Sequence, residues 1–523
     1  MIDTVRITSE RGTGARPGLM LTTCCVSIAV IMGLTSGAMA VVPAIGLDIG
    51  GDQSQLQWAT DVFPVVVAAL LLPAGALLDR YGRRRGMLIG LVILTGSVLW
   101  TGAADSIEAV IVSRVLAGIG AALLFPGTLA TITAVVPTAR RTFAVALWAT
   151  SVVAGAVFGL VIFATAADLW SWRWAFLIVA ALTFVLTVLT WAVVPETRAE
   201  DEVVLDPVGA VTSVIAIGGL VLAVTEAPVH GWLGPRTLVP GLVGLLVLIV
   251  FVRWELRHRH PLLDVRLLMD ARFGAGCATL FFAFFAHFAM YFLAIQYLIY
   301  VLGWSTLHAA FGVALPAMGM ATTPLGPVLS RRFGRRIVIV AAMAVCVLGA
   351  LVCVAMAASG GRDYWTFAVG AGLLWSGVAT AMAPPTEMIT EAVPDEKQGV
   401  ASAVNDLARE LAAAAGIAVC GSMFNTFYRA SVEDRTALLP ADVGELALAS
   451  PGAALAAAGR TPDPALTVDV VQDGILAGWN GALTMTAIVT MLGAVLVWRR
   501  CPSLSEERAS KVTLNETRHR PAG

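Results

Sequence analysis

The chain has 523 residues, of which 58% are hydrophobic and 13% are charged, and its formal net charge is -1. A mean hydropathy of +0.83 leaves too few polar residues to cover a water-soluble surface, which excludes a chain of ordinary soluble domains. The near-zero net charge gives no global attraction to nucleic acid or acidic lipid, so the distribution of charge matters more than its sum.

The apolar residues form blocks of about 20, the length of helix that spans the hydrocarbon core of a bilayer. The first block follows three arginines, as a signal peptide does, but it is too long and lacks a small-residue cleavage site, so we expect it to remain as a span. In chain order the predicted membrane-spanning helices cover residues 20–46, 56–78, 87–104, 109–133, 143–165, 175–194, 207–226, 237–252, 273–301, 309–329, 337–357, 365–389, 400–425 and 475–498.

The positions of lysine and arginine predict the orientation of these spans. With the N-terminus inside, 26 of the 34 Lys and Arg residues fall in cytoplasmic segments and 6 in external ones, while Arg114 and Arg409 lie within spans. Because cytoplasmic loops carry the excess of positive charge, both termini are predicted to lie in the cytoplasm. The expected location is therefore the inner (plasma) membrane of a cell, with many spans.

The sequence contains no signature of a metal, cofactor or catalytic site. All seven cysteines lie within spans or at a cytoplasmic end, and no Cys/His spacing is typical of a zinc site. There is no P-loop, no metalloprotease motif and no nucleophile elbow. We therefore predict no disulfide, no metal, no cofactor and no enzyme activity.

A short basic motif occurs twice. Residues 75–85 follow the second span, and a decayed copy at 331–336 follows the tenth, with Gly334 lying 252 positions after Gly82. Two six-helix halves joined directly would place the second copy after the eighth span, so two extra helices are predicted between the halves. Duplicated halves with a site near the membrane midplane are typical of secondary transporters.

The motif has a physical interpretation as a gate at the cytoplasmic face. Gly82 permits a tight turn, and Asp79 can hold either nearby arginines or a helix N-terminus, while the arginines anchor the loop. The alternative is an ordinary short cytoplasmic loop. The predicted gate residues are Gly75, Asp79, Arg80, Gly82, Arg83 and Arg84.

The order of several motifs resembles the fourteen-span drug:proton antiporter family of the major facilitator superfamily, of the multidrug efflux type. Only two lysines and many Ala, Gly, Val and Arg are typical of a GC-rich bacterium such as an actinobacterium. The matching motifs are residues 75–85, Gln57-Trp58 with Asp61 and Phe63, Arg114 with 118–122, 170–174, 261–264, 296–298, Pro384, 402–406 and 409–411.

The resemblance implies an all-α integral membrane protein with the major facilitator fold. This fold has two six-helix bundles, here with two extra central helices, for about 14 spans. The implied organisation is a cytoplasmic tail at 1–19, an N-terminal bundle at 20–195, two extra helices at 207–252, a cytoplasmic linker at 253–272, a C-terminal bundle at 273–498 with an outer loop at 429–473, and a cytoplasmic tail at 499–523.

Three departures from the family pattern concern coupling more than fold. Leu34 and Met39 stand where relatives carry an Asp and an Asn in the first span. In the fifth span, residues 159–164 keep only the first glycine, Gly159, of a motif associated with antiport. Residues 412–413 are alanines where relatives carry two glycines, which is a milder change.

Charged side chains within spans usually face a cavity or a partner, because a charge at the bilayer centre is costly. Asp61 and Arg114 are expected at matching depths near the outer ends of spans two and four, so they are predicted to pair, directly or through water, and to act in proton coupling. The alternatives are that Arg114 is a structural pin capped by backbone carbonyls, and that Asp61 lies in the outer headgroup zone.

Span thirteen carries the deepest carboxylate. Glu410 is predicted to lie about 16 Å from the cytoplasmic start of its helix, which makes it the best substrate or proton carboxylate. Asp406 shares its helix face, and Arg409 can neutralise Asp406, so a structural ion cluster remains the alternative. Glu387 lies near Pro384 in a span predicted to be kinked, and it is a candidate for a gate role or a solvated one.

Span nine is rich in aromatic residues, with Phe281, Phe285, Phe288 and Phe292 on one stripe beside His287. This stripe either stacks on flat or cationic substrates or packs against lipid and helices. The acidic outer loop at 429–473 is the one sizeable soluble segment, and it is expected to form short helices.

The function predicted from these features is the export of amphipathic small molecules, such as drugs, dyes or a natural product, by proton antiport. The predicted partners are therefore a small amphipathic substrate, protons and the lipid bilayer, with no nucleic acid, and the chain is expected to be a monomer. A lipid or glycolipid exporter with the same fold is one alternative. A non-transporting membrane binding or scaffold protein is an alternative of another class.

Overall fold

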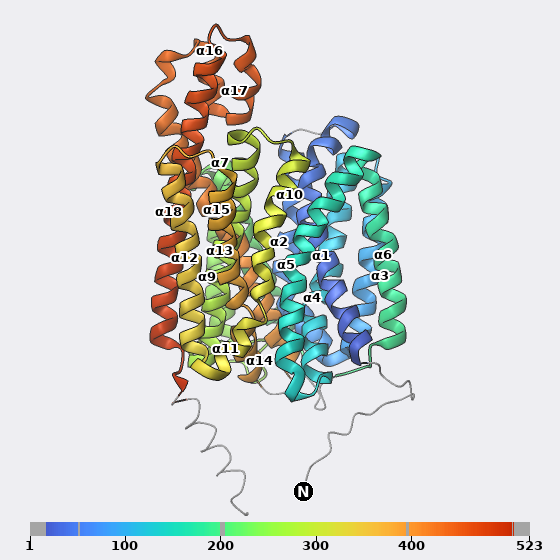
Figure 1. The fold of residues 1–523 in the computed structure, drawn as a ribbon. Helices are drawn as coiled ribbons and strands as arrows, with labels where there is room; N and C mark the ends of the chain where they lie inside the picture. Colours follow the sequence, from blue (N-terminus) through green and yellow to red (C-terminus); the bar gives the residue numbers. More distant parts are fainter. Residues whose placement is uncertain (1–16, 51–52, 199–203, 394–396, 505, 507–523) are drawn as a thin grey trace, which may run out of the picture. The chain divides into compact units, whose positions relative to one another are not determined.

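The computed structural model describes residues 17–50, 53–198, 204–393, 397–504 and 506 (Figure 1). These residues form helices and no strand. Fourteen helical segments among them are long and apolar enough to cross a membrane, which confirms the predicted number of spans. The predicted cytoplasmic tails lie mostly outside the described residues, which start at 17 and end at 506.

The chain divides into two compact units, and the first contains residues up to 214 together with 250–264 and 393–406. In this unit α1 packs against α5, α2 against α4, and α3 against both α4 and α6. Its complete helices are α1 (Pro17–Ile49), α2 (Gln53–Tyr81), α3 (Arg83–Gly102), α4 (Ile107–Val135), α5 (Thr138–Leu169) and α6 (Trp172–Val193).

Glycines allow the closest of these contacts. A Cβ atom on Gly159 of α5 would overlap the backbone of Gly33 in α1. Small residues let two helix backbones approach in a membrane, where packing rather than the hydrophobic effect holds helices together. The one glycine that survives of the degraded span-five motif is therefore required for packing.

The two extra helices are α7 (Pro207–His230) and α8 (Pro235–Glu255). Residues 215–249 belong to the second unit, where Gly219 of α7 lies against the backbone of Gly244 in α8. The start of α7 and the end of α8 belong to the first unit. There Asp206 accepts a hydrogen bond from the Gly209 N–H at 2.8 Å and so caps the first turn of α7.

The second unit contains residues 215–249, 265–392 and 407–523. In it α9 packs against α14 and α18, and α12 packs against α13 and α18. Its remaining elements are η1 (Val265–Met269), α9 (Ala271–Gln296), the π-helical turn η2 (Tyr297–Val301), α10 (Thr306–Ala317), η3 (Met318–Thr322), α11 (Leu325–Phe333), α12 (Arg335–Ala358), α13 (Tyr364–Thr380), α14 (Ala383–Glu391), α15 (Gln398–Glu433, whose first residues belong to the first unit), η5 (Thr436–Leu438), α16 (Ala441–Ala449), α17 (Pro451–Ala457), η6 (Ala458–Arg460) and α18 (Pro464–Arg500).

Two spans of this unit are interrupted. The 3-10 segment η3 separates α10 from α11 in span ten. Span twelve breaks between α13 and α14, directly before Pro384 and Pro385, and this confirms the kink that the sequence predicts. Proline has no backbone N–H and its ring obstructs the preceding turn, so two consecutive prolines favour a break at this place.

The connection between α15 and α18 is shorter than the outer loop predicted at 429–473. The reason is that α15 continues to Glu433 and α18 begins at Pro464, beyond the apolar stretches that mark the spans. Between them α16 and α17 form the expected short helices, which extend past the long helices of this unit (Figure 1). Tyr428 of α15 donates a hydrogen bond to the Ala447 carbonyl at 2.7 Å and holds α16 in place.

Candidate functional site

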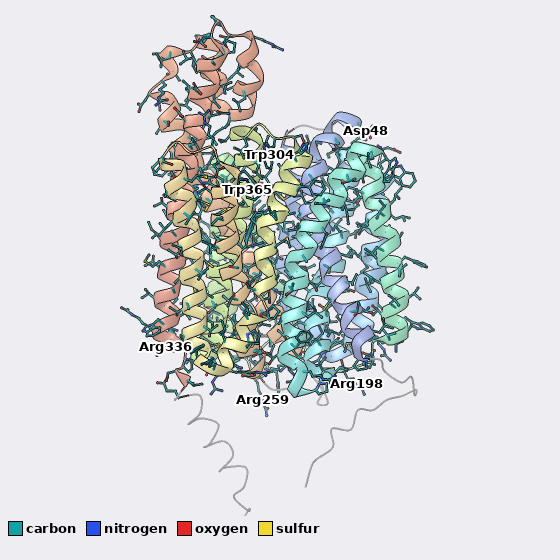
Figure 2. All side chains as sticks on the ribbon, in the orientation of Figure 1. Asp48, Arg198, Arg259, Trp304, Arg336 and Trp365 are labelled. Atoms are coloured by element: carbon teal, nitrogen blue, oxygen red, sulfur yellow. The ribbon has the colours of Figure 1, made fainter. Side chains whose placement is uncertain are left out.

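The repeated basic motif folds as the sequence predicts. Helix α2 ends at Tyr81, α3 begins at Arg83, and Gly82 between them has a φ of 105°, which favours glycine. Figure 2 shows Asp48 at one end of the first unit and Arg198 and Arg259 at the other.

Asp79 makes both of the contacts that the sequence suggests, one with an arginine and one with a helix N-terminus. Its side chain is 1% exposed and accepts a hydrogen bond from Arg83 Nη2 at 3.0 Å. It also accepts hydrogen bonds from the backbone N–H groups of Gly399 at 2.9 Å and Val400 at 3.2 Å. These two donors belong to the first turn of α15, where N–H groups have no partner within the helix. One carboxylate therefore neutralises an arginine and caps a helix.

Gly75 makes this cap possible. A Cβ atom on Gly75 would lie 2.6 Å from the Gly399 carbonyl oxygen and 2.9 Å from the Ala403 Cβ. Both distances are shorter than real Cβ contacts, so any larger residue would force α2 and the start of α15 apart.

The arginines after Gly82 bind backbone and a carboxylate that sequence reasoning missed. Arg83 Nη1 donates to the Ala130 carbonyl of α4 at 3.4 Å. The Arg84 backbone N–H donates to Glu196 at 3.2 Å, and Arg85 Nε lies 3.6 Å from the same carboxylate. Burial raises the pKa of Glu196 above its usual range. The available signal was an acidic residue directly after span six, on the side of the membrane assigned to the arginines.

Arg80 and Arg84 differ in their surroundings. Arg80 is exposed, with its guanidinium 5.5 Å from the ring of Tyr81. Arg84 extends along α6, where its Nη2 donates to the Trp191 carbonyl.

The second copy of the motif has the same plan within the second unit. Gly334 has a φ of 86°, and Arg335 pairs with Glu387 at 3.3 Å and with Glu391 at 2.7 Å, both on α14. Arg336 lies 4.2 Å from the ring of Trp498 near the end of α18. In each copy, therefore, the second arginine after the glycine contacts a tryptophan on the last helix of its bundle. Arg84 contacts the backbone carbonyl of Trp191, and Arg336 contacts the ring of Trp498.

The copies differ at the position that caps a helix in the first copy. Arg331 stands where the first copy has Asp79, three residues before the glycine. The second copy has no carboxylate at that position to cap a helix. Glu387, with its side chain 12% exposed, instead enters the ion pair with Arg335.

Arg114 is buried, with an exposure of 1%, and it contacts backbone and an aromatic ring. Its Nε donates to the Ala59 carbonyl at 3.3 Å, and its guanidinium lies 4.6 Å from the ring of Phe63. It makes no ion pair with Asp61, which is half-buried, among the residues that the structure describes. Its Nη1 and Nη2 atoms are buried and have no hydrogen-bond partner there. This geometry matches the alternative in which Arg114 is a structural residue bound to a backbone carbonyl oxygen. Its Nη1 and Nη2 atoms are not used in that contact.

The candidate acids of span thirteen are divided between the units. Asp406 is fully buried in the first unit and accepts a hydrogen bond from Asn405 Nδ2 at 3.3 Å. In the second unit Glu410 is half-buried, and the guanidinium of the adjacent Arg409 lies 5.5 Å from the ring of Phe284.

An aromatic cluster in the second unit surrounds His287 on α9. Its ring lies 5.0 Å from that of Phe288, 5.8 Å from Phe284 and 6.2 Å from Trp375 of α13. His287 Nδ1 and Trp375 Nε1 are buried without a hydrogen-bond partner in the described part of the chain. Buried polar atoms are nearly always satisfied, so these two atoms among aromatic rings are candidates to bind a polar atom of a ligand. Sequence reasoning weighed His287 but missed Trp375.

The described residues contain no group of three or more His, Cys, Asp or Glu placed to hold a metal ion. The cysteines are all free.

Comparison with known proteins gives consistent matches. Residues 23–417 match the family model described as Major Facilitator Superfamily. The chain is 30% identical over 459 residues to the multidrug efflux pump LfrA of Mycolicibacterium smegmatis, covering 86% of this chain and 88% of the relative. It is also 30% identical over 395 residues to the multidrug resistance protein Stp of Mycobacterium tuberculosis, covering 75% and 73%. A solved bacterial homolog of the human lysosomal transporter Spinster has a TM-score of 0.57 at 16% identity, covering 94% of this chain and 100% of that one, and supports the fold.

Proposed function

Since the chain belongs to the Major Facilitator Superfamily, we propose that it exports amphipathic small molecules in exchange for protons. The relatives with full-length matches are named as multidrug efflux and multidrug resistance proteins, which supports this substrate class. The observation that carries the proposal is the aromatic cluster around His287. Apolar rings with two unsatisfied polar atoms suit a molecule that is largely apolar and has few polar groups.

The gate we propose is the Asp79 cap. Alternating access requires a contact that closes one side of the membrane and breaks when the other side closes. The hydrogen bonds from Gly399 and Val400 to Asp79 are such a contact, because they join α2 to the start of α15 through one carboxylate. The ion pair of Arg335 with Glu387 is the corresponding contact within the second unit.

For the proton we propose Glu410 as the carrier, with Asp61 and Asp406 as the other candidate carboxylates. Glu410 is half-buried next to the buried Arg409 in a membrane-spanning helix, where an uncompensated charge is costly. Arg114, with two donors unused, is proposed to bind an acceptor group of the substrate.

The orientation is part of the proposal. We place both termini in the cytoplasm of the inner membrane, with bundles at 20–195 and 273–498 and extra helices at 207–252. Reporter fusions after residues 85, 270 and 505 are expected to report the cytoplasm, and fusions near 52, 232 and 450 the outside. Fusions at 232 and 270 on the same side would contradict this arrangement.

The function is tested by purified protein in liposomes with an imposed pH gradient. The panel contains lipophilic cations, neutral antibiotics and labelled phospholipids. We expect gradient-driven movement of at least one drug-like compound. Movement of phospholipid alone would favour a lipid exporter, and no movement of any compound would favour a binding protein without turnover.

A further inference from the structure

One surface of the first unit shares no residue with the gate or with the candidate substrate site. It is formed by the end of α8 and the turn that follows it, where a groove of about 360 Å³ is lined by Val250, Arg253, Trp254, Arg257 and His258. Val250, Arg253 and Trp254 follow the spacing i, i+3 and i+4 on one face of α8, and Arg257 lies in the turn directly after the helix. Figure 2 shows Arg259, in the same turn, at the end of the unit that carries Arg198.

The groove faces outward from the protein. Only 17% of the most apolar window of α8 is buried, the smallest share among the fourteen candidate spans. Val250 is 53% exposed, and Arg253 and Arg257 are exposed as well. In a membrane the exposed apolar residues of this span would face lipid, and the two arginines follow them at its end.

The groove is held in shape by buried contacts on its other side. Trp254 Nε1 donates a hydrogen bond to Asp206 Oδ2 at 2.8 Å, and the His258 ring stacks on Trp254 at 5.1 Å and 18°. Glu255, which is 2% exposed, accepts a hydrogen bond from the Leu263 N–H at 3.0 Å. The tryptophan side chain and the turn after it are thus fixed before any ligand binds, which lowers the entropic cost of binding.

Within the described ranges, no carboxylate forms an ion pair with the arginines of the groove. Arg253 and Arg257 form no ion pair with any residue that the structure describes. Two guanidinium groups at the membrane boundary, next to a fixed tryptophan and an apolar wall, complement a phosphate group attached to acyl chains. We propose that this groove binds the headgroup of an anionic phospholipid, with the phosphate at Arg253 and Arg257 and the chains along the Val250 side.

The test compares phosphatidylglycerol with phosphatidylcholine, each titrated into the purified full-length protein in detergent and followed by native mass spectrometry. The test variant is Arg253→Gln with Arg257→Gln. The matched control is Arg259→Gln with Arg272→Gln, which removes the same charge from the neighbouring linker. Each arginine near an anionic lipid contributes about 1 kcal/mol, which is about fivefold, so the test variant is expected to bind phosphatidylglycerol about 25-fold more weakly.

The supporting result is a preference for phosphatidylglycerol that the control keeps, the test variant loses, and Arg253→Lys with Arg257→Lys largely restores. Restoration by lysine also shows that the loss does not come from misfolding. Equal losses in the test and control variants would overturn the proposal in favour of general charge attraction. Equal binding of both lipids by the wild type would also overturn it. Displacement of phosphatidylglycerol by millimolar inorganic phosphate would assign the groove to a soluble anion instead.

Discussion

The carboxylate of Asp79 accepts a hydrogen bond from the backbone N–H of Gly399 at 2.9 Å, although the two residues are 320 positions apart in the chain. The same carboxylate neutralises Arg83, which is itself 2% exposed. A single side chain therefore holds the end of α2, the start of α3 and the first turn of α15. Each of these contacts depends on the negative charge or on both carboxylate oxygens.

Asp79→Asn is expected to impair transport without preventing membrane insertion. Asparagine has one acceptor oxygen, so it cannot serve both backbone donors as the carboxylate does, and it leaves the buried Arg83 without a counter-charge. Removing one partner of a buried ion pair costs about 3–5 kcal/mol. The measurement is transport in liposomes per amount of inserted protein, with Asp105→Asn as a control because the Asp105 side chain is 98% exposed. Unchanged transport in well-expressed Asp79→Asn would refute the gate assignment.

Gly75→Ala is expected to lower both the midpoint of thermal unfolding and transport. The new methyl group would lie 2.6 Å from the Gly399 oxygen, and both atoms belong to helix backbone that cannot move alone. Gly96→Ala is the matched control, because nothing lies within 4 Å of its Cβ position. Alanine there is expected to stabilise the helix by about 0.5–1 kcal/mol. A similar response of the two variants would show that the α2 contact with α15 is not tight.

Glu196 predicts a dependence of stability on pH. Burial raises the pKa of this carboxyl above its ordinary 4.5, against the opposing effect of the Arg84 N–H, so the fold favours the protonated form. The stability it contributes is complete below pH 4.5 and is lost as the pH rises through the raised pKa. Glu196→Gln, which mimics the protonated form, is expected to become more stable than the wild type as the pH increases.

The pKa of Asp48 is shifted in the opposite direction to that of Glu196. Its hydrogen bond from Arg173 lowers the pKa of the carboxyl, so the stability it contributes is lost as the pH falls. Thermal unfolding of Glu196→Gln and Asp48→Asn across the acidic range measures both effects. Parallel pH profiles for the two variants would contradict the assignment of their causes.

Trp375→Phe and His287→Phe are expected to change substrate preference rather than stability. Each removes a buried polar atom that has no hydrogen-bond partner among the described residues, and each keeps an aromatic ring. A lost hydrogen bond of about 0.5–1.5 kcal/mol corresponds to roughly 2- to 12-fold weaker binding of substrates that carry polar groups. Trp365→Phe is the control, since Trp365 is exposed at the other end of α13 (Figure 2). Lower stability with unchanged substrate binding would mean that both residues only pack.

The sequence was sufficient for features that depend on local chemistry. The fourteen spans follow from apolar blocks, the turn at Gly82 from the need for a positive φ, and the break before Pro384 from the missing N–H. The two tasks of Asp79 were foreseen as alternatives, because a carboxylate next to arginines at a helix end suits both. What the sequence could not show was that one carboxylate does both.

Features that depend on the direction of side chains around a helix were not predictable. The sequence places Asp61 and Arg114 at matching depths, but depth does not fix the direction in which each side chain points, and it did not show that Arg114 binds the Ala59 carbonyl. Glu196 and Trp375 were missed because their partners come from segments far away in the chain. The end of α15 and the start of α18 were predicted at 425 and 475, because helices continue beyond the apolar residues that mark a span.

Proton release on substrate binding tests the proposed antiport most directly. Detergent-solubilised protein in weak buffer with a pH indicator is mixed with a transported compound, and the wild type is compared with Glu410→Gln and Asp61→Asn. Glu410 is the deeper of the two carboxylates, so we expect release from the wild type and from Asp61→Asn, and none from Glu410→Gln. Identical release from all three proteins would contradict the assignment of the proton to Glu410, and no release from any of them would contradict proton coupling itself.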